Sequence, residues 1–295
     1  MATSVQAAQH RLVDRGRLLV SCHDRPGLIA AVSRFLAEHG AKVVDSDQHS
    51  TGSRTNLFFM RVEFDLPDLE ARLTDLQTKF ASVAALFAME WRMALAKYPK
   101  RLAIFVSREE HCLLELLWQQ RAGDLYAEVA VVVSNHEDLR GMVEALGVPF
   151  ECVLVTPDAK AEAEARQQAI LKGRADVVVL ARYMQILSHD FISEWPNRII
   201  NIHHSFLPAF VGAKPYDQAY RRGVKLIGAT AHYVTEELDA GPIIEQDVAR
   251  VDHRQGVDDL RRMGRHIERI VLARAVAWHA EDRILVHGNK TVVFA

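Results

Sequence analysis

Short apolar runs alternate with helical patterns between residues 102 and 180, and this alternation constrains the fold more than any other feature. The runs are continuous, as expected for strands that are buried on both faces of a parallel sheet. Between them, apolar residues recur at the spacing of an amphipathic helix. We therefore predict an α/β domain with a Rossmann-like, mostly parallel sheet covered by helices. The predicted strands are 102–106, 127–133, 150–155 and 176–180, and the predicted helices are 110–120, 137–146 and 159–171.

The first ninety-five residues follow a different pattern. Strands are expected at 17–22, 42–49, 55–64 and 89–95, with amphipathic helices at 28–36 and 69–86. This order of strand, helix, strand, strand, helix and strand is the ferredoxin-like, split βαβ arrangement. We predict a flexible N-terminus (1–15), a first domain (16–93), a linker (94–100) and a second domain (101–295). The second domain is expected to close with a helix (258–279) and a hairpin (284–287 and 291–294) around Gly288-Asn289-Lys290.

Composition narrows the function classes. The chain has 295 residues, 49% of them hydrophobic and 25% charged, and a net charge of −2, which favours neither nucleic acid nor an anionic membrane as a partner. The three cysteines (Cys22, Cys112 and Cys152) are scattered, as is usual for free thiols in a reducing cytoplasm. No signal peptide and no membrane-spanning segment is evident. We expect a cytoplasmic protein.

The stretch from residue 199 to residue 239 carries the strongest functional signal. Ile199 and Ile200 read as the end of a buried strand, which would place the side chains of Asn201 and His203 on one face. Further on, Asp239 lies in the turn Glu-Leu-Asp-Ala-Gly-Pro. An amide, an imidazole and a carboxylate that converge at strand ends suit acyl chemistry. On spacing alone, an ordinary turn and ordinary strand-end residues are the alternative.

The amino-acid sequence of this stretch also resembles that of a known family. Asn-Ile-His-His-Ser-Phe-Leu-Pro (201–208), followed by Gly-Ala-Thr-Ala-His-Tyr-Val-Thr-Glu-Glu-Leu-Asp-Ala-Gly-Pro (228–242), resembles the formyltransferase family that uses 10-formyltetrahydrofolate. The resemblance implies that Asn201, His203 and Asp239 are the catalytic set. We find no pattern for a zinc site, and on a strand the adjacent His203 and His204 would point to opposite faces, so we predict no metal.

A second stretch is similar to the folate-binding loop of that family. Residues 181–188, which follow the predicted strand 176–180, match the family segment whose backbone and apolar side chains hold the pterin ring. The resemblance assigns Arg182, Met184, Ile186 and Leu187 to the folate pocket, with core packing as the alternative for each. Lys214 could meet the anionic tail of folate, although a solvated loop lysine is the simpler interpretation.

The first domain resembles an ACT domain, a module that often binds amino acids. The similarity covers about residues 16–93 and includes the loop Asp-Arg-Pro-Gly-Leu-Ile at the start of the first helix. It implies an effector site near Asp24, Pro26, Gly27 and Leu28, where backbone N–H groups at a helix start suit a carboxylate. Glycine and methionine are the candidate effectors. A purely structural dimerisation domain is the alternative, and the family implies a dimer or tetramer.

Three acceptors for the formyl group compete, namely glycinamide ribonucleotide, methionyl-tRNA and water. The first requires a phosphate site, for which the ribonucleotide enzymes use a glycine-rich turn after the first strand, but here residues 107–113 contain no glycine and two adjacent carboxylates. The tRNA enzyme is expected to have a further domain and a basic surface. Water remains, and the S-x-x-x-H-C-L loop after an ACT domain resembles formyltetrahydrofolate deformylases.

The resemblance thus implies hydrolysis of 10-formyltetrahydrofolate to formate and tetrahydrofolate, which supplies formate and balances the one-carbon pool for purine synthesis. No cofactor is expected, because the folate is the substrate. Asn201 would donate to the oxyanion, and the pair of His203 and Asp239 would move the proton, with the assignment of the base left open. A catalytically silent regulator that binds folate or an amino acid is the alternative from another class.

Overall fold

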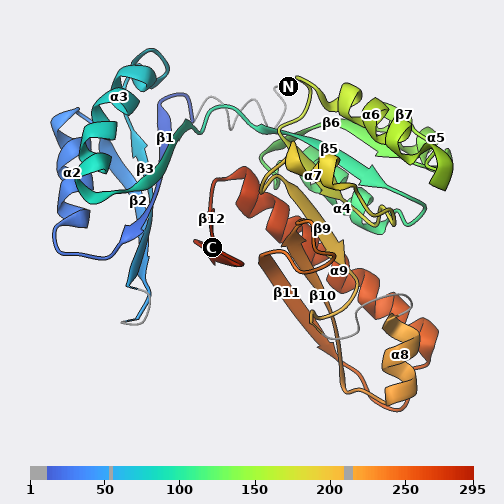
Figure 1. The fold of residues 1–295 in the computed structure, drawn as a ribbon. Coiled ribbons are helices and arrows are strands. Elements are labelled where there is room, and N and C mark those ends of the chain that lie inside the picture. Colours follow the sequence, from blue (N-terminus) through green and yellow to red (C-terminus); the bar gives the residue numbers. More distant parts are fainter. Residues whose placement is uncertain (1–11, 53–55, 209–214) are drawn as a thin grey trace. The chain divides into compact units, whose positions relative to one another are not determined.

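The computed structural model describes residues 12–52, 56–208 and 215–295 (Figure 1). Residues 1–11 of the predicted N-terminal segment lie outside the described residues. The chain divides into two compact units. The first unit contains the chain up to Pro99 together with Trp278–His287 and Val292–Ala295, and the second contains Lys100–Ala277 and Gly288–Thr291.

The first unit has the predicted ferredoxin-like order. Its elements are β1 (Arg15–His23), α2 (Leu28–Glu38), β2 (Lys42–Ser50), β3 (Leu57–Asp65), α3 (Leu69–Phe87) and β4 (Glu90–Leu95). The strands form an antiparallel sheet in the order β2-β3-β1-β4, and α2 and α3 lie on one face of it (Figure 1). β1 begins at Arg15, inside the segment that we predict to be flexible, because Arg15 pairs with Asp65 across the sheet.

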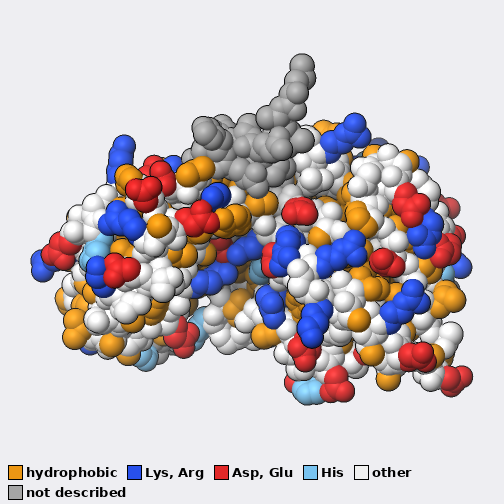
Figure 2. All heavy atoms as spheres, turned by 90° about the horizontal axis from the view of Figure 1, so that it is seen from above, with side chains coloured by type: hydrophobic (Ala, Val, Ile, Leu, Met, Phe, Trp, Pro, Cys, Tyr) orange, Lys and Arg blue, Asp and Glu red, His pale blue; other side chains and the backbone are white. Residues whose placement is uncertain are grey.

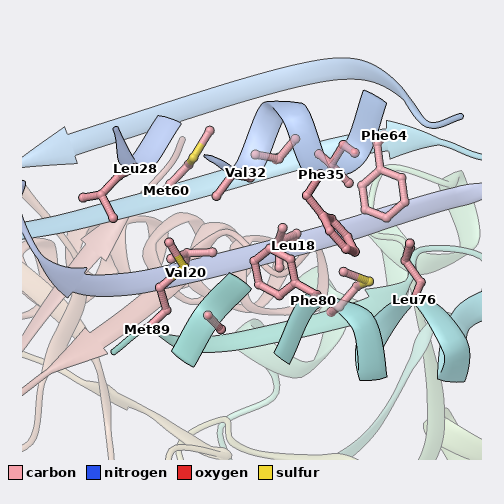
Figure 3. Close-up of a cluster of buried hydrophobic side chains, with 14 of the residues drawn as sticks. Leu18, Val20, Leu28, Val32, Phe35, Met60, Phe64, Leu76, Phe80 and Met89 are labelled. Carbon is pink, nitrogen blue, oxygen red and sulfur yellow. The ribbon is translucent and has the colours of Figure 1, made fainter. Parts of the chain in front are cut away.

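The core of the first unit forms between this sheet and the two helices (Figure 3). Side chains alternate across the strands, so Leu18 and Val20 on β1 face the helices. On α2 the buried residues recur at helical spacing, as Val32 and Phe35 do. Burying each large apolar side chain stabilises the fold by roughly 1.5–3 kcal/mol, so this cluster holds the two layers together.

Two buried arginines extend from the same sheet. Arg17 is 5% exposed and Arg61 is 1% exposed. Arg61 donates to the carbonyl oxygens of Glu281 (3.1 Å) and Asp282 (3.0 Å), and Arg17 donates to that of Ala280 (3.4 Å). Carbonyl groups at a helix C-terminus carry partial negative charge, which favours nearby cations. Residues 278–287 and 292–295, which we predict to be part of the second domain, therefore pack with the first unit.

The second unit has the predicted, mostly parallel sheet. Its strand order is β11-β10-β9-β8-β5-β6-β7, with parallel pairing from β9 to β7 and antiparallel pairing of β10 and β11. The carboxyl ends of the parallel strands therefore meet at one edge. The strands are β5 (Lys100–Val106), β6 (Ala127–Ser134), β7 (Phe150–Cys152), β8 (Val177–Leu180), β9 (Ile199–His203), β10 (Leu226–Tyr233) and β11 (Ile243–Arg250).

Helices flank this sheet (Figure 1). They are α4 (His111–Ala122), α5 (Arg140–Ala145), η1 (Pro157–Ala159), α6 (Lys160–Leu171), α7 (His189–Ser193), α8 (Pro215–Arg222) and α9 (Val257–Ala280). β12 (Ile284–His287) and β13 (Lys290–Val293) form the predicted hairpin. None of the helices in the described ranges is long and apolar enough to span a membrane.

Two predicted elements are shorter than expected. The strand predicted at 150–155 is β7, an edge strand that ends at Cys152 because its only partner, β6, ends opposite it at Ser134. The helix predicted at 137–146 is α5, which begins at Arg140. Figure 2 shows Lys and Arg side chains interspersed with Asp and Glu over the face in view, as the net charge of −2 leads one to expect.

Candidate active site

A cavity of about 540 Å³ lies in the second unit, and its lining includes residues from the carboxyl end of β9 and from the loop that follows β8. Ligands bind at this edge in open α/β sheets. Asn201 and His203 from β9 line the cavity together with Asp239 from the turn between β10 and β11. The structure thus brings together the three residues that the sequence motif singles out.

His203 and Asp239 form a buried pair. His203 Nδ1 lies 3.2 Å from Asp239 Oδ2, and the His203 side chain is 6% exposed. The hydrogen bond with His203 holds the pKa of Asp239 well below its usual range, even though burial acts in the opposite direction. On the other side of the ring, His203 Nε2 has no hydrogen-bond partner in the described chain. A nitrogen fixed in this way is suited to proton transfer.

His232 supports this pair and the Asn201 amide. It lies on β10 directly opposite Asn201, and its Nε2 is 3.2 Å from Asn201 Nδ2 and 3.6 Å from Asp239 Oδ1. The Tyr233 carbonyl oxygen, 2.9 Å from His232 Nδ1, accepts the proton of that nitrogen, so Nε2 of the neutral ring is an acceptor. The Asn201 amide then donates one N–H to His232 and keeps the other for a ligand.

The turn that carries Asp239 depends on Gly241. Asp239 has a φ of 55°, in the left-handed region, which Asp tolerates better than most residues. A Cβ atom on Gly241 would lie 1.9 Å from the Tyr233 carbonyl oxygen. The close approach of the two backbones at this point requires glycine, which explains the Asp-Ala-Gly-Pro sequence.

Three of the four residues assigned to the folate pocket line the cavity, namely Arg182, Met184 and Ile186. Arg182 and Met184 have φ angles of 63° and 55°, a conformation that is costly for such side chains and that occurs preferentially at functional sites. The side chains of Met184 and Ile186 are 61% and 63% exposed. Leu187 instead packs in a hydrophobic core cluster. Lys214 lies outside the described residues.

Ser107 fixes this loop from the end of β5. Its hydroxyl contacts the Tyr183 carbonyl oxygen and lies 2.7 Å from Asn135 Oδ1, and its N–H donates to the Arg182 carbonyl oxygen at 3.2 Å. Ser107 begins the loop 107–113, whose sequence distinguishes the possible acceptors of the formyl group, and it also holds the predicted folate loop in place.

His204 corrects one prediction. We expect His203 and His204 to point to opposite faces, but both line the cavity, with ring centroids 5.3 Å apart. The reason is that β9 ends at His203, so His204 no longer follows the alternation of a strand. Burial, and secondarily the charge of Arg182, lowers the pKa of His204 to about 4.

A second polar group lines the cavity and was missed from sequence. Glu268 on α9 is 1% exposed and lies 2.8 Å from His111 Nε2 and 2.6 Å from the Tyr216 hydroxyl. His111, Cys112 and Glu268 could also reach a common metal ion, since their ligand atoms lie within 4.8 Å of one another. Arg182 Nε is 3.6 Å from the same carboxylate, and this positive charge opposes a metal cation there.

Comparisons with known proteins decide the family. A family model described as formyl transferase matches residues 100–276, and one described as ACT domain matches residues 16–80. The formyltetrahydrofolate deformylase of Bacillus subtilis (strain 168) is 58% identical over 282 residues, which cover 95% of this chain and 94% of that protein. The chain belongs to the formyltetrahydrofolate deformylase family.

Solved structures agree with this membership. A deformylase from Pseudomonas syringae pv. tomato has a TM-score of 0.90 and 48% identity, over 98% of this chain and 99% of that one. Glycinamide ribonucleotide transformylase 1 from Symbiobacterium toebii has a TM-score of 0.63 and 32% identity, over 67% of this chain and 95% of that one. The predicted fold, a ferredoxin-like ACT domain followed by a Rossmann-like formyltransferase domain, is confirmed.

The ACT domain of this deformylase family member contains the loop that we predict to bind an effector. Gly27 has a φ of 94° and precedes α2, where Leu28 is 2% exposed and belongs to the core. The Asp24 N–H donates to the Asn56 carbonyl oxygen at 2.8 Å. Pro26 is exposed. Pro26 and Gly27 are thus exposed and Asp24 is half-buried, whereas the Leu28 side chain is committed to packing, and effector binding at this loop stays a prediction.

Proposed function

We propose that the protein hydrolyses 10-formyltetrahydrofolate to formate and tetrahydrofolate, as the names of its relatives indicate. One observation carries the proposal, namely that Asp239 holds His203 at 3.2 Å while His203 Nε2 has no partner in the described chain and the ring lines the cavity. Asn201 lines the same cavity. Amide, imidazole and carboxylate are the groups that acyl transfer to water requires.

The reaction follows from these positions. The folate ring lies against the apolar side of the cavity, where Met184 and Ile186 are exposed. Water attacks the formyl carbon, and Asn201 donates to the oxyanion of the tetrahedral intermediate. The bond from carbon to N10 then breaks, N10 takes up a proton, and formate and one proton are released. No cofactor enters this scheme.

We assign proton transfer to His203. The depressed pKa of Asp239 keeps it ionised throughout the working pH range, which makes it a weak base but a good partner for an imidazolium. Asp239 therefore orients His203 and stabilises the charge that His203 acquires. Because the two groups interact directly, their titration belongs to the pair.

The test is to incubate the purified protein with 10-formyltetrahydrofolate and no acceptor, and to assay formate and tetrahydrofolate together. We expect equal amounts of both products, and their loss in Asp239→Asn. Turnover that depends on added glycinamide ribonucleotide would instead establish the transferase, which the similarity to that enzyme keeps as the second candidate. Glu109 on the cavity wall disfavours it, since a carboxylate repels a phosphate. Absence of turnover under both conditions would indicate a folate-binding or amino-acid-binding regulator.

We further propose that the ACT domain binds glycine or methionine at the loop of Asp24, Pro26 and Gly27, and that the protein forms a dimer or tetramer in the cytoplasm. The free thiols of Cys22, Cys112 and Cys152 suit that reducing compartment. Titration calorimetry with each amino acid tests the effector, and sedimentation equilibrium tests the assembly. No heat of binding with either amino acid would remove both candidates.

A further inference from the structure

Glu268 is the centre of a buried polar network on one side of the active-site cavity. It receives a hydrogen bond from the Tyr216 hydroxyl at 2.6 Å, and it lies 2.8 Å from His111 Nε2 and 3.6 Å from Arg182 Nε. These partners come from α8, from the first residue of α4 and from the loop after β8. One carboxylate thus fixes three side chains that are far apart in the sequence.

The surroundings of Glu268 are built to keep it charged. Burial alone raises the pKa of a carboxyl group, but the hydrogen bond with His111 and the charge of Arg182 lower the pKa of Glu268 to about 2. Gly264 lies one turn before Glu268 on α9, and a Cβ there would be 1.9 Å from the Tyr216 hydroxyl. A glycine inside a helix is unfavourable, and here its absent side chain leaves room for Tyr216 to reach the carboxylate.

The network adjoins the proposed catalytic residues. His204 lies between the two groups, with its ring centroid 5.3 Å from that of His203 and 6.2 Å from that of Tyr216. The cavity lining thus includes a set of neighbouring polar side chains, called here the polar side (Glu268, His111, Tyr216, Arg182 and His204), and a set of exposed apolar side chains, called the apolar side (Met184, Ile186 and Leu238).

Buried nitrogen atoms without partners gather on the polar side. Within the described chain, His111 Nδ1, Arg182 Nε and Arg182 Nη1 on this side have no hydrogen-bond partner, and neither does Nε2 of the adjoining His203. Buried polar atoms are nearly always paired with protein or with ordered water, and a water site needs two to four polar neighbours and room. The polar side meets these conditions, whereas the apolar side suits a flat heterocycle.

We propose that Glu268 is a positioning residue that holds His111, Tyr216 and Arg182 as a polar wall, and that this wall retains the attacking water beside the formyl carbon. The inference rests on the proposed function, because only a hydrolase needs this water. Glu268 touches no reacting atom. The water oxygen bonds to the formyl carbon, the bond from carbon to N10 breaks, N10 gains a proton, and formate and a proton leave.

The experiment measures how the formyl group divides between water and a competing nucleophile. Hydroxylamine attacks the same carbon and yields formylhydroxamate and tetrahydrofolate, so the ratio of formylhydroxamate to formate reports how well water is held. The ratio is independent of how much enzyme is correctly folded, because both products come from the same active site.

In Glu268→Gln we expect kcat for formate to fall by about 10²-fold with little change in KM, and the product ratio to rise at least about tenfold in the same measurement. Glu115→Gln is the matched control, because Glu115 on α4 is likewise a carboxylate near an arginine of α9, with Oε2 3.9 Å from Arg269 Nε, but does not line the cavity. We expect no change in its ratio. Tyr216→Phe removes one hydrogen bond to Glu268 and should raise the product ratio to an intermediate value. If Glu268→Gln does not fold, the product ratio of Tyr216→Phe tests the proposal instead.

An unchanged ratio in Glu268→Gln, with both products reduced alike, would show that Glu268 has a merely structural role and would overturn the proposal. The same conclusion would follow from an unchanged ratio in Tyr216→Phe. Failure of the wild-type protein to release formate would be a separate result, since it removes the hydrolase function itself.

Discussion

Gly264→Ala tests the packing on which the Glu268 network depends. The new Cβ would lie 1.9 Å from the Tyr216 hydroxyl oxygen and 2.2 Å from Cζ. Because non-bonded heavy atoms stay about 3.5 Å apart, the ring would have to withdraw by roughly 1.5 Å. The 2.6 Å hydrogen bond to Glu268 cannot survive such a displacement.

The expected magnitude follows from three terms. Overpacking costs about 1–3 kcal/mol, and loss of a buried hydrogen bond to a charged group costs about 1.5–3 kcal/mol. Replacing a helical glycine by alanine returns about 1 kcal/mol. We therefore expect Gly264→Ala to lower the free energy of unfolding by roughly 1.5–5 kcal/mol.

The assay is urea denaturation followed by circular dichroism, with Gly141→Ala as the matched control. Gly141 lies in α5, and a Cβ there meets nothing within 4 Å. The same substitution should therefore raise stability by about 1 kcal/mol at this position. The change in the free energy of unfolding should therefore have opposite signs at the two glycines. If Gly264→Ala were neutral or stabilising, the close approach of Tyr216 to α9 would be refuted.

Three further predictions concern the active site. Asn201→Ala should lower kcat by about 10²–10³ with a modest change in KM if the amide donates to the oxyanion, and steady-state kinetics showing only a KM effect would remove that role. Gly241→Ala should displace the turn that carries Asp239, because its Cβ would lie 1.9 Å from the Tyr233 carbonyl oxygen. We therefore expect kcat to fall while the affinity for folate, measured by titration, changes little. A variant with the kcat of the wild-type protein would disprove the need for glycine. His204 has a pKa of about 4 in the folded state and about 6.5 when unfolded. Between these pH values the unfolded chain binds more protons than the folded one. The free energy of unfolding therefore falls by on the order of 3 kcal/mol as the pH drops through this window. His204→Gln should reduce the difference between urea midpoints at pH 7 and pH 4.5, and an unaltered difference would contradict the cause.

Local patterns in the sequence predicted most of the fold. The continuous apolar run of β5 and the alternation of strands and helices predicted a parallel sheet, because strands with such runs are stable only when both faces of the sheet are covered. The edge strand β7 and the start of α5 were less well predicted, since the length of an edge strand depends on its neighbour. The packing of residues 278–287 with the first unit rests on Arg17 and Arg61, and no local pattern reveals partners so distant in the chain.

The candidate site was predictable where its residues share a motif. Asn201 and His203 are two residues apart on one strand, so strand geometry alone places them together. His232 was missed because its role depends on the pairing of β10 with β9, although a polar residue in a buried strand was a signal. Glu268 was missed because the helical pattern drew attention to Ile267 and Val271. The signal available in the sequence was a carboxylate next to Ile267 and three residues before Val271, close to the apolar face of the predicted helix.

The assignment of residues 278–287 and 292–295 to the first unit has a consequence for biosynthesis. The ACT domain is translated first, yet the carbonyl oxygens that Arg17 and Arg61 bind belong to Ala280, Glu281 and Asp282. During translation these buried guanidinium groups lack these carbonyl acceptors until almost the whole catalytic domain has left the ribosome. The first domain to be made is thus among the last to be completed, because a fragment that ends at Pro99 would keep the ion pairs of both arginines with Glu63 but lack the carbonyl oxygens that complete their hydrogen bonds.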